Sequence, residues 1–186
     1  MNSNQVLLRA VEPLDLELLY EKENNPEIWG MGNTLAPHSR HTLQQYIQDA
    51  QQDIYAARQL RLMIDVQQAD GVRLTVGAVD LFDFDPQNLR AEVGIIIYEP
   101  SFRQKGYATQ AMLRLISYAT DTLQLHQLHC SVAESNEASI ALFRKVGFEV
   151  TGVKKDWRKK SPQAFENEVL MQRILQQNRK SKSDTA

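Results

Sequence analysis

A basic loop with a single glycine is the part of the chain best suited to bind an anion. It follows an apolar run at residues 93–98 and precedes a run with helical spacing at residues 109–120. The first amides of a helix lack an intrahelical acceptor, and the helix dipole adds positive charge there. Glycine lets the main chain approach a phosphate closely. The sequence therefore predicts a phosphate or pyrophosphate site formed by Arg103, Gln104, Lys105, Gly106, Tyr107 and Ala108.

Other reactive side chains form no comparable set. The four histidines, His38, His41, His126 and His129, show no spacing that indicates a metal site. Residues 126 and 129 lie three apart on a predicted strand, so their side chains point to opposite faces. Cys130 is an alternative nucleophile, but on a buried strand a free cysteine behaves as a small apolar residue. We therefore expect no metal and no covalent intermediate.

The composition is typical of one ordinary globular domain. The chain has 186 residues, of which 42% are hydrophobic and 24% are charged. Its net charge of −2 does not favour binding to nucleic acid. No apolar run approaches the roughly 20 residues that span a bilayer, and the N-terminal residues lack the features of a secretory signal. A single cysteine fits a reducing compartment, so we expect a cytoplasmic protein without nucleic-acid or membrane partners.

The first third of the chain predicts one strand and two helices. Residues 6–9 are expected to form the strand, and Pro13 fits the first turn of a helix at residues 13–23. The leucines expected on the inner side of this helix are Leu14, Leu18 and Leu19. Ser39 is a predicted N-cap of the second helix. The apolar side of that helix is expected to contain Leu43, Tyr46, Ile47, Ala50 and Ile54.

From residue 60 onward the spacing favours strands. We expect strands at residues 60–66, 72–84, 91–98, 126–132, 148–153 and 165–175, and helices at residues 109–122 and 136–146. Asp70-Gly71 and residues 85–88 predict turns. This order predicts a mixed α/β sheet, mostly antiparallel, with helices on both faces and one right-handed parallel crossover. Residues 1–175 are expected to form one domain, followed by a polar, flexible tail at 176–186.

A second motif gives the chain a family resemblance. From Asn136 to Phe148 the sequence runs Asn, small residues, an aromatic residue, Lys and Gly-Phe. Asn136 fits a helix N-cap, and Gly147 fits a left-handed helix terminator. With the loop at residues 103–108 and the strand between them, this segment resembles the GNAT superfamily of N-acetyltransferases. The chain is most similar to the branch that holds ribosomal-protein N-terminal acetyltransferases and spermidine N-acetyltransferases.

The resemblance implies a GNAT-like acyl-CoA N-acyltransferase fold with acetyl-CoA as cofactor. In this family the strands at 93–98 and 126–132 begin side by side and then separate, and the pantetheine arm enters the gap between them. The pyrophosphate is held by the loop that precedes the helix. The residues implied to contact the cofactor are Ile95, Ile96 and Ile97 through their main chain, Arg103, Gln104, Lys105, Gly106, Tyr107, Ala108, Thr109, Asn136 and Phe143.

The implied reaction is direct transfer of an acetyl group to a primary amine. An alkylamine is mostly protonated at pH 7, so a carboxylate has to accept its proton. Glu92 opens the cofactor-binding strand and matches a family carboxylate, which makes it the leading base or water-positioning carboxylate. The alternative is a solvated glutamate at the edge of the strand. Asp80 is a candidate for binding the acceptor amine, against the alternative of an ordinary surface aspartate. A backbone N–H at or near Ile97 is expected to stabilise the oxyanion.

Three positions depart from the family pattern. Phe143 stands where many relatives carry a tyrosine that protonates the leaving thiolate. The remaining candidate donors are Tyr98, Tyr107, Ser135 and water. Ser131 stands where N-terminal acetyltransferases often carry a glutamate. Residues 30–33 replace an acidic pair of the polyamine enzymes, which disfavours a polycationic acceptor.

These observations leave two classes of function. The first is an active acetyltransferase acting on a small amine, a polyamine or a protein N-terminal amine. The second, motivated by Phe143, is a non-catalytic acyl-CoA-binding sensor or regulatory module. A purely structural α/β domain, a third reading, would have no affinity for CoA. Exposed strands also allow a homodimer.

Overall fold

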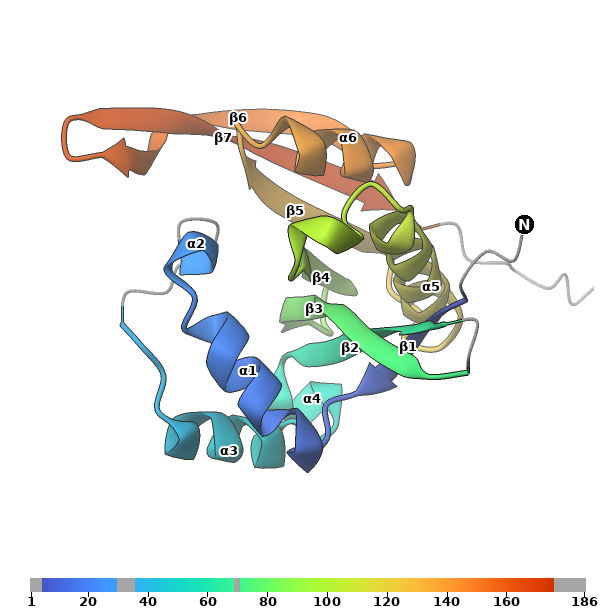
Figure 1. Ribbon diagram of the computed structural model, residues 1–186. Helices are drawn as coiled ribbons and strands as arrows, with labels where there is room; N and C mark the ends of the chain where they lie inside the picture. The colour runs from blue at the N-terminus through green and yellow to red at the C-terminus, as the bar shows by residue number, and fades with distance from the viewer. Residues whose placement is uncertain (1–4, 30–35, 69–70, 176–186) are drawn as a thin grey trace, which may run out of the picture.

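A seven-stranded mixed sheet forms the centre of the protein (Figure 1). The computed structural model describes residues 5–29, 36–68 and 71–175, so the predictions for residues 30–33, for Asp70 and for the tail lie outside the described residues. The strands are β1 (Val6–Ala10), β2 (Leu60–Gln67), β3 (Arg73–Asp85), β4 (Arg90–Ile97), β5 (Gln127–Ala133), β6 (Glu149–Ser161) and β7 (Ala164–Ile174). The helices are α1 (Leu16–Glu23), α2 (Pro26–Trp29), α3 (Arg40–Asp49), α4 (Ile54–Ala57), α5 (Tyr107–Asp121) and α6 (Glu137–Lys145).

The strand order across the sheet is β1-β2-β3-β4-β5-β7-β6. Every neighbouring pair is antiparallel except β4 and β5, which run parallel and are joined through α5. The predicted mixed α/β sheet with one parallel pair is therefore confirmed. None of the helices in the described part of the chain is long and apolar enough to cross a membrane.

β4 and β5 pair over three residues and then separate. The pairs are Arg90–Gln127, Ala91–Leu128 and Glu92–His129. Farther along, β4 stays beside β3 as far as Ile97, whereas β5 pairs with β7 as far as Ala133. The predicted divergence is confirmed, and no described strand pairs with β4 on this side beyond Glu92.

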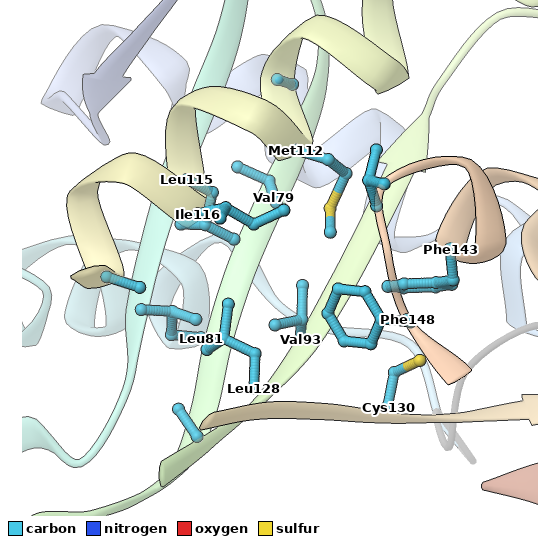
Figure 2. Packing of buried hydrophobic residues seen from close by; sticks show 14 of the residues in the cluster. Val79, Leu81, Val93, Met112, Leu115, Ile116, Leu128, Cys130, Phe143 and Phe148 are labelled. Atoms are coloured by element: carbon cyan, nitrogen blue, oxygen red, sulfur yellow. The ribbon is translucent and has the colours of Figure 1, made fainter. Parts of the chain in front are cut away.

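Apolar side chains cover both faces of the sheet. On one face, side chains of α5 pack against the strands (Figure 2). The α5 residues include Met112, Leu115 and Ile116, and the strand residues include Val79, Leu81 and Val93. On the opposite face, Leu19 of α1 and Leu43 and Ile47 of α3 cover the strands. They form one cluster with Met63 of β2 and Ala78 of β3. Burying a Leu, Ile or Met side chain contributes about 1.5–3 kcal/mol. The two clusters therefore hold helices on both faces, as predicted.

Leu14 does not face the core, contrary to the prediction. Pro13–Asp15 forms a separate 3₁₀ turn before α1, and Leu14 is 95% exposed there. Asp15 is buried instead, because its carboxylate accepts hydrogen bonds from the Arg9 guanidinium at 2.7 and 2.8 Å and from the Glu12 N–H at 2.8 Å. A polar network, not leucine spacing, sets the conformation of this turn.

The helix predicted to extend to Ile54 is in fact two helices. α3 begins after Ser39, whose hydroxyl accepts a hydrogen bond from the Thr42 N–H at 3.0 Å, as predicted, and it ends at Asp49. Asp53 then caps α4 by accepting two N–H groups of its first turn, at 2.8 and 3.0 Å. The change of direction places Ile54 in the cluster under α5 and not with the α3 side chains.

β6 and β7 form a long hairpin at one edge of the sheet. Figure 1 shows its tip reaching past the other strands. β6 is the edge strand, and on it Val153 is 49% exposed and Trp157 is 60% exposed. The hairpin therefore presents apolar surface next to main-chain groups at an open edge.

Candidate functional site

The open edge of β4 presents the main-chain groups of alternate residues. The Tyr98 N–H donates to the Val76 carbonyl of β3 at 3.0 Å. Main-chain groups of successive residues turn to opposite edges of a strand. Ile95 and Ile97 therefore direct their N–H and C=O groups into the gap beside β5, whereas Ile96 directs its groups to β3. Such an edge can pair with an extended ligand as with an added strand.

The predicted anion loop ends at a helix N-terminus that is open to solvent. Gly106 caps α5 with a φ of 81°, and a Cβ built there would meet no atom within 4 Å. α5 begins at Tyr107, two residues earlier than predicted, so Ala108 and Thr109 belong to its first turn. Amides of this turn have no acceptor within the helix. Gln104 also has a positive φ, of 60°, and turns of this kind gather N–H groups into anion-binding concavities.

Two cations flank this loop. The Arg103 guanidinium lies 3.4 Å from the Ile97 carbonyl oxygen, measured from both Nε and Nη2, so it bridges the loop and the end of β4. The Lys105 Nζ lies 5.6 Å from the centre of the Phe102 ring. Both side chains are exposed. Positive charge and helix amides therefore converge at the Ile97 end of the gap between β4 and β5, away from Glu92.

Asn136 is the N-cap of α6, as predicted. Its Oδ1 accepts a hydrogen bond from the Ser139 N–H at 3.1 Å. It follows the C-terminal end of β5, on the far side of the gap from β4. The predicted contact between Asn136 and a cofactor arm stays a prediction.

Phe143 lies in the core under α5. It is 3% exposed, and its ring packs edge-to-face on Phe148 with 5.0 Å between centroids. Figure 2 shows both rings near Cys130. Burial, with a smaller effect of the Glu92 charge, raises the pKa of the Cys130 thiol to about 12. The thiol is buried, as expected, and its protonated form makes it a poor nucleophile.

Glu92 marks the point where β4 and β5 part. It belongs to the last residue pair between them, opposite His129, and its Oε2 lies 3.9 Å from the His129 Nδ1. On the other side it is in register with Phe82 of β3. Its carboxylate side chain is 18% exposed, so it is partly shielded from water. Sequence spacing gave no signal for His129 as its neighbour, because the contact depends on the register of β4 against β5.

Asp80 forms an ion pair with Arg61. The Arg61 guanidinium donates from Nε to one carboxylate oxygen at 2.7 Å and from Nη2 to the other at 3.0 Å. Its Nη1 donates to the Glu23 carboxylate of α1 at 2.5 Å. Asp80 is therefore one member of a network of two carboxylates and one guanidinium. Arg61 and Glu23 were not among the predicted site residues.

This network lines a cavity of about 320 Å³ on the face of the sheet opposite α5. The other side chains around it include His38, Thr42, Tyr46 and Phe82. A Cβ added to Gly94 of β4 would lie 3.2 Å from a ring carbon of Phe82 and 3.9 Å from the Asp80 Cβ. The cavity wall therefore adjoins β4 within two residues of Glu92.

Tyr98 is buried on the same face of the sheet. Its side chain belongs to the cluster beneath α1 and α3, and in the described part of the chain its hydroxyl has no hydrogen-bond partner. Burial raises the pKa of Tyr98. The Arg61 charge opposes this shift, and the carboxylates of Glu23, Asp80 and Asp15 add to it. Tyr98 and Glu92 are six residues apart, or about 20 Å along a strand. Tyr98 as proton donor to the thiolate stays a prediction.

The diverging strands and the glycine-capped helix N-terminus of this α/β fold suit an extended ligand that carries phosphate groups. The chain belongs to the acetyltransferase (GNAT) domain family, whose model matches residues 5–149. The family resemblance read from the sequence is confirmed. GNAT enzymes use acetyl-CoA. The cofactor contacts that the resemblance implies at the gap and the loop stay predictions.

The chain is also similar to individual acetyltransferases in sequence and to a solved structure in fold. The chain is 41% identical over 75 residues to human alpha/beta-tubulin-N-acetyltransferase 9, a match that covers 40% of this chain and 36% of that protein. It is 28% identical over 151 residues to the spermidine N(1)-acetyltransferase of Escherichia coli K12, covering 81% and 76%. The structure of Vibrio cholerae spermidine N-acetyltransferase with CoA and spermine superposes with a TM-score of 0.78 at 23% identity, covering 92% and 96%.

Proposed function

We propose that the protein transfers the acetyl group of acetyl-CoA to a primary amine. The observation that carries this proposal is the continuous path from the anion loop at Gly106, along the open edge of β4, to Glu92. The five residue steps from Ile97 to Glu92 span about 17 Å of extended strand. The family membership and the named acetyltransferase relatives support the same activity.

The residues around the gap fit acetyl-CoA. The space at Gly106 and the first-turn amides of α5 suit a pyrophosphate, with Arg103 and Lys105 beside it. The main-chain groups of Ile95 and Ile97 suit pairing with the pantetheine arm. When bound, the cofactor supplies an acetyl group activated as a thioester. The N–H groups on the same edge of β4 are positioned to donate to an oxyanion.

Glu92 is the proposed base. A primary amine has a reference pKa of about 10.4, so it has to lose a proton before it attacks. The Glu92 carboxylate is partly shielded and lies on the cavity side of the sheet, where it can accept that proton directly or through one water molecule. Asp80 is proposed to act through its ion pair with Arg61, by fixing the charge of the cavity wall.

The acceptor amine is proposed to enter from the cavity lined by Glu23, Arg61 and Asp80. One relative is named for tubulin and another for spermidine. We propose a protein N-terminal amine and a polyamine as the candidate classes. Release of free thiol from acetyl-CoA with a panel of both classes tests the activity. Acetyl-CoA-dependent turnover of any of these amines supports the proposal, and binding of acetyl-CoA without turnover would indicate the sensor function instead.

Two finer expectations accompany the activity. We propose a cytoplasmic location, which the single buried Cys130 supports. We also propose that the chain forms a homodimer through the β6 edge, where Trp157 and Val153 are exposed. Light scattering coupled to gel filtration measures the mass, and Trp157→Asp should shift a dimer toward monomer.

A further inference from the structure

We infer that Arg61 makes the acceptor cavity selective for amines with one positive charge and against polyamines. This inference rests on the proposed function, because it takes the cavity beside Gly94 as the acceptor site. It selects one of the two candidate substrate classes: an amine with a carbonyl group close by, as at a peptide N-terminus.

The position of Arg61 is fixed by its neighbours. It is in register with Asp80 across β2 and β3, and the two groups form a bidentate ion pair. The third contact, to Glu23, ties the guanidinium to α1. Exposed fractions are low for all three side chains, at 18% for Arg61 and 22% for each carboxylate. A charge held this firmly and shielded from water acts strongly on any ion that enters the cavity.

The formal charge of the network favours a single ammonium group. Glu23 and Asp80 contribute −2 and Arg61 contributes +1, which leaves −1. One protonated amine neutralises this charge before it gives up its proton. Glu92, the proposed base, faces the reacting amine. A second or third ammonium group of a polyamine would therefore find no further carboxylate of this network and would approach the guanidinium, which repels it.

The guanidinium also offers a contact that a peptide can use and a polyamine cannot. It has five N–H donors, and its contacts to Asp80 and Glu23 use three. Polyamines carry no hydrogen-bond acceptor when protonated, whereas the first carbonyl of a peptide accepts such bonds. Charge and hydrogen bonding therefore favour the same substrate class.

The test compares kcat/KM for spermidine with kcat/KM for a tetrapeptide that has a free N-terminus and uncharged side chains. We expect the wild-type protein to prefer the tetrapeptide. Arg61→Met removes the charge and keeps most of the stem, so the ratio of the two kcat/KM values should shift at least tenfold toward spermidine. Arg40→Met is the matched control, because Arg40 pairs with Glu17 in the open, with 54% and 68% of the two side chains exposed.

A second variant keeps the test decisive if Arg61→Met does not fold. Glu23→Gln leaves the bidentate Arg61–Asp80 pair in place and brings the network to zero formal charge. It should raise KM for both amines. It should also lower kcat/KM for spermidine further relative to kcat/KM for the tetrapeptide. A wild-type preference for spermidine, or ratios within threefold in Arg61→Met or Glu23→Gln, would overturn the inference while turnover itself persists. Absence of turnover with every amine would instead overturn the proposed function.

Discussion

Glu92 and His129 face each other at the last residue pair that joins β4 to β5, with 3.9 Å between the glutamate Oε2 and the histidine Nδ1. Beyond this pair the strands separate and the gap begins. The proposed base therefore stands at the closed end of the proposed cofactor site. Its carboxylate is held by sheet register and not by a flexible loop, which suits a group that has to accept a proton at a fixed position.

Glu92→Gln should slow turnover by about 10²-fold or more, because the amide cannot accept the proton of the amine. Affinity for acetyl-CoA should change little, since the proposed cofactor contacts are main-chain groups and the loop. Steady-state kinetics and calorimetry measure the two effects separately. Glu149→Gln, an exposed change on β6, is the control. Equal rates in Glu92→Gln and the wild type would remove Glu92 from the mechanism.

Gly106→Glu should abolish detectable binding of acetyl-CoA. The new carboxylate would occupy the open space at the helix N-terminus and repel the pyrophosphate. Gly71→Glu is a closely matched control, because Gly71 has a φ of 84° and a Cβ there also meets no atom within 4 Å. Both variants carry the same strain of a left-handed residue. Calorimetry should show a loss only at position 106, and unaltered affinity there would refute the loop assignment.

Phe143→Tyr should destabilise the protein and should not increase its rate of acetyl transfer. The ring is buried against Phe148, so the added hydroxyl would lack a partner, at a cost of about 1–3 kcal/mol. Phe165→Tyr, at a position 56% exposed, should leave stability nearly unchanged. Urea unfolding and thiol release measure both quantities. A large gain in rate would show that position 143 reaches the reacting thiol and that the wild-type site is dormant.

Arg9→Met should lower the free energy of unfolding by about 3–5 kcal/mol, because it leaves the buried carboxylates of Asp15 and Asp65 without their cation. Arg40→Met removes an arginine from an exposed pair and should cost at most about 1 kcal/mol. Chemical denaturation of both variants provides the comparison. Similar losses at the two positions would mean that the Arg9 network adds nothing beyond a surface ion pair.

The same network should make stability fall at acid pH. Burial alone would raise the pKa of Asp15, but hydrogen bonds from Arg9 and from the Glu12 N–H outweigh burial and lower it. A lowered folded-state pKa contributes stability that is present above the ordinary value of 3.8 and is lost as the pH falls through the folded value. Unfolding measured from pH 5 to pH 2.5 should therefore show a smaller decline for Asp15→Asn than for the wild type. Parallel declines would contradict this.

Local signals in the sequence predicted most of the fold. Ser39 and Asn136 cap their helices as expected, because a cap depends on a hydrogen bond to an N–H only three residues away. The prediction for Leu14 was wrong because the buried carboxylate of Asp15, and not leucine spacing, sets the conformation of this turn. The helix predicted through Ile54 was wrong because Asp53 starts a new one.

Contacts that depend on register could not be read in the same way. Arg61 meets Asp80 only because β2 and β3 align these two residues, and a bulge between Ile64 and Asp65 shifts that alignment along the strands. Glu23 joins them from a helix 38 residues earlier in the chain. The loop at Gly106 was predictable because a glycine directly before a helix is a local signal, whereas the proposed acceptor cavity is assembled from side chains of four separate elements, α1, α3, β2 and β3.

In the described part of the chain, β4 and β5 form three ladder pairs, and this boundary separates the first four strands of the sheet from the last three. A pantetheine arm hydrogen-bonded to the edge of β4 would occupy the place of a strand in the gap beyond these pairs. The bound cofactor would then complete the sheet between β4 and β5. Its release after each acetyl transfer would open the gap again.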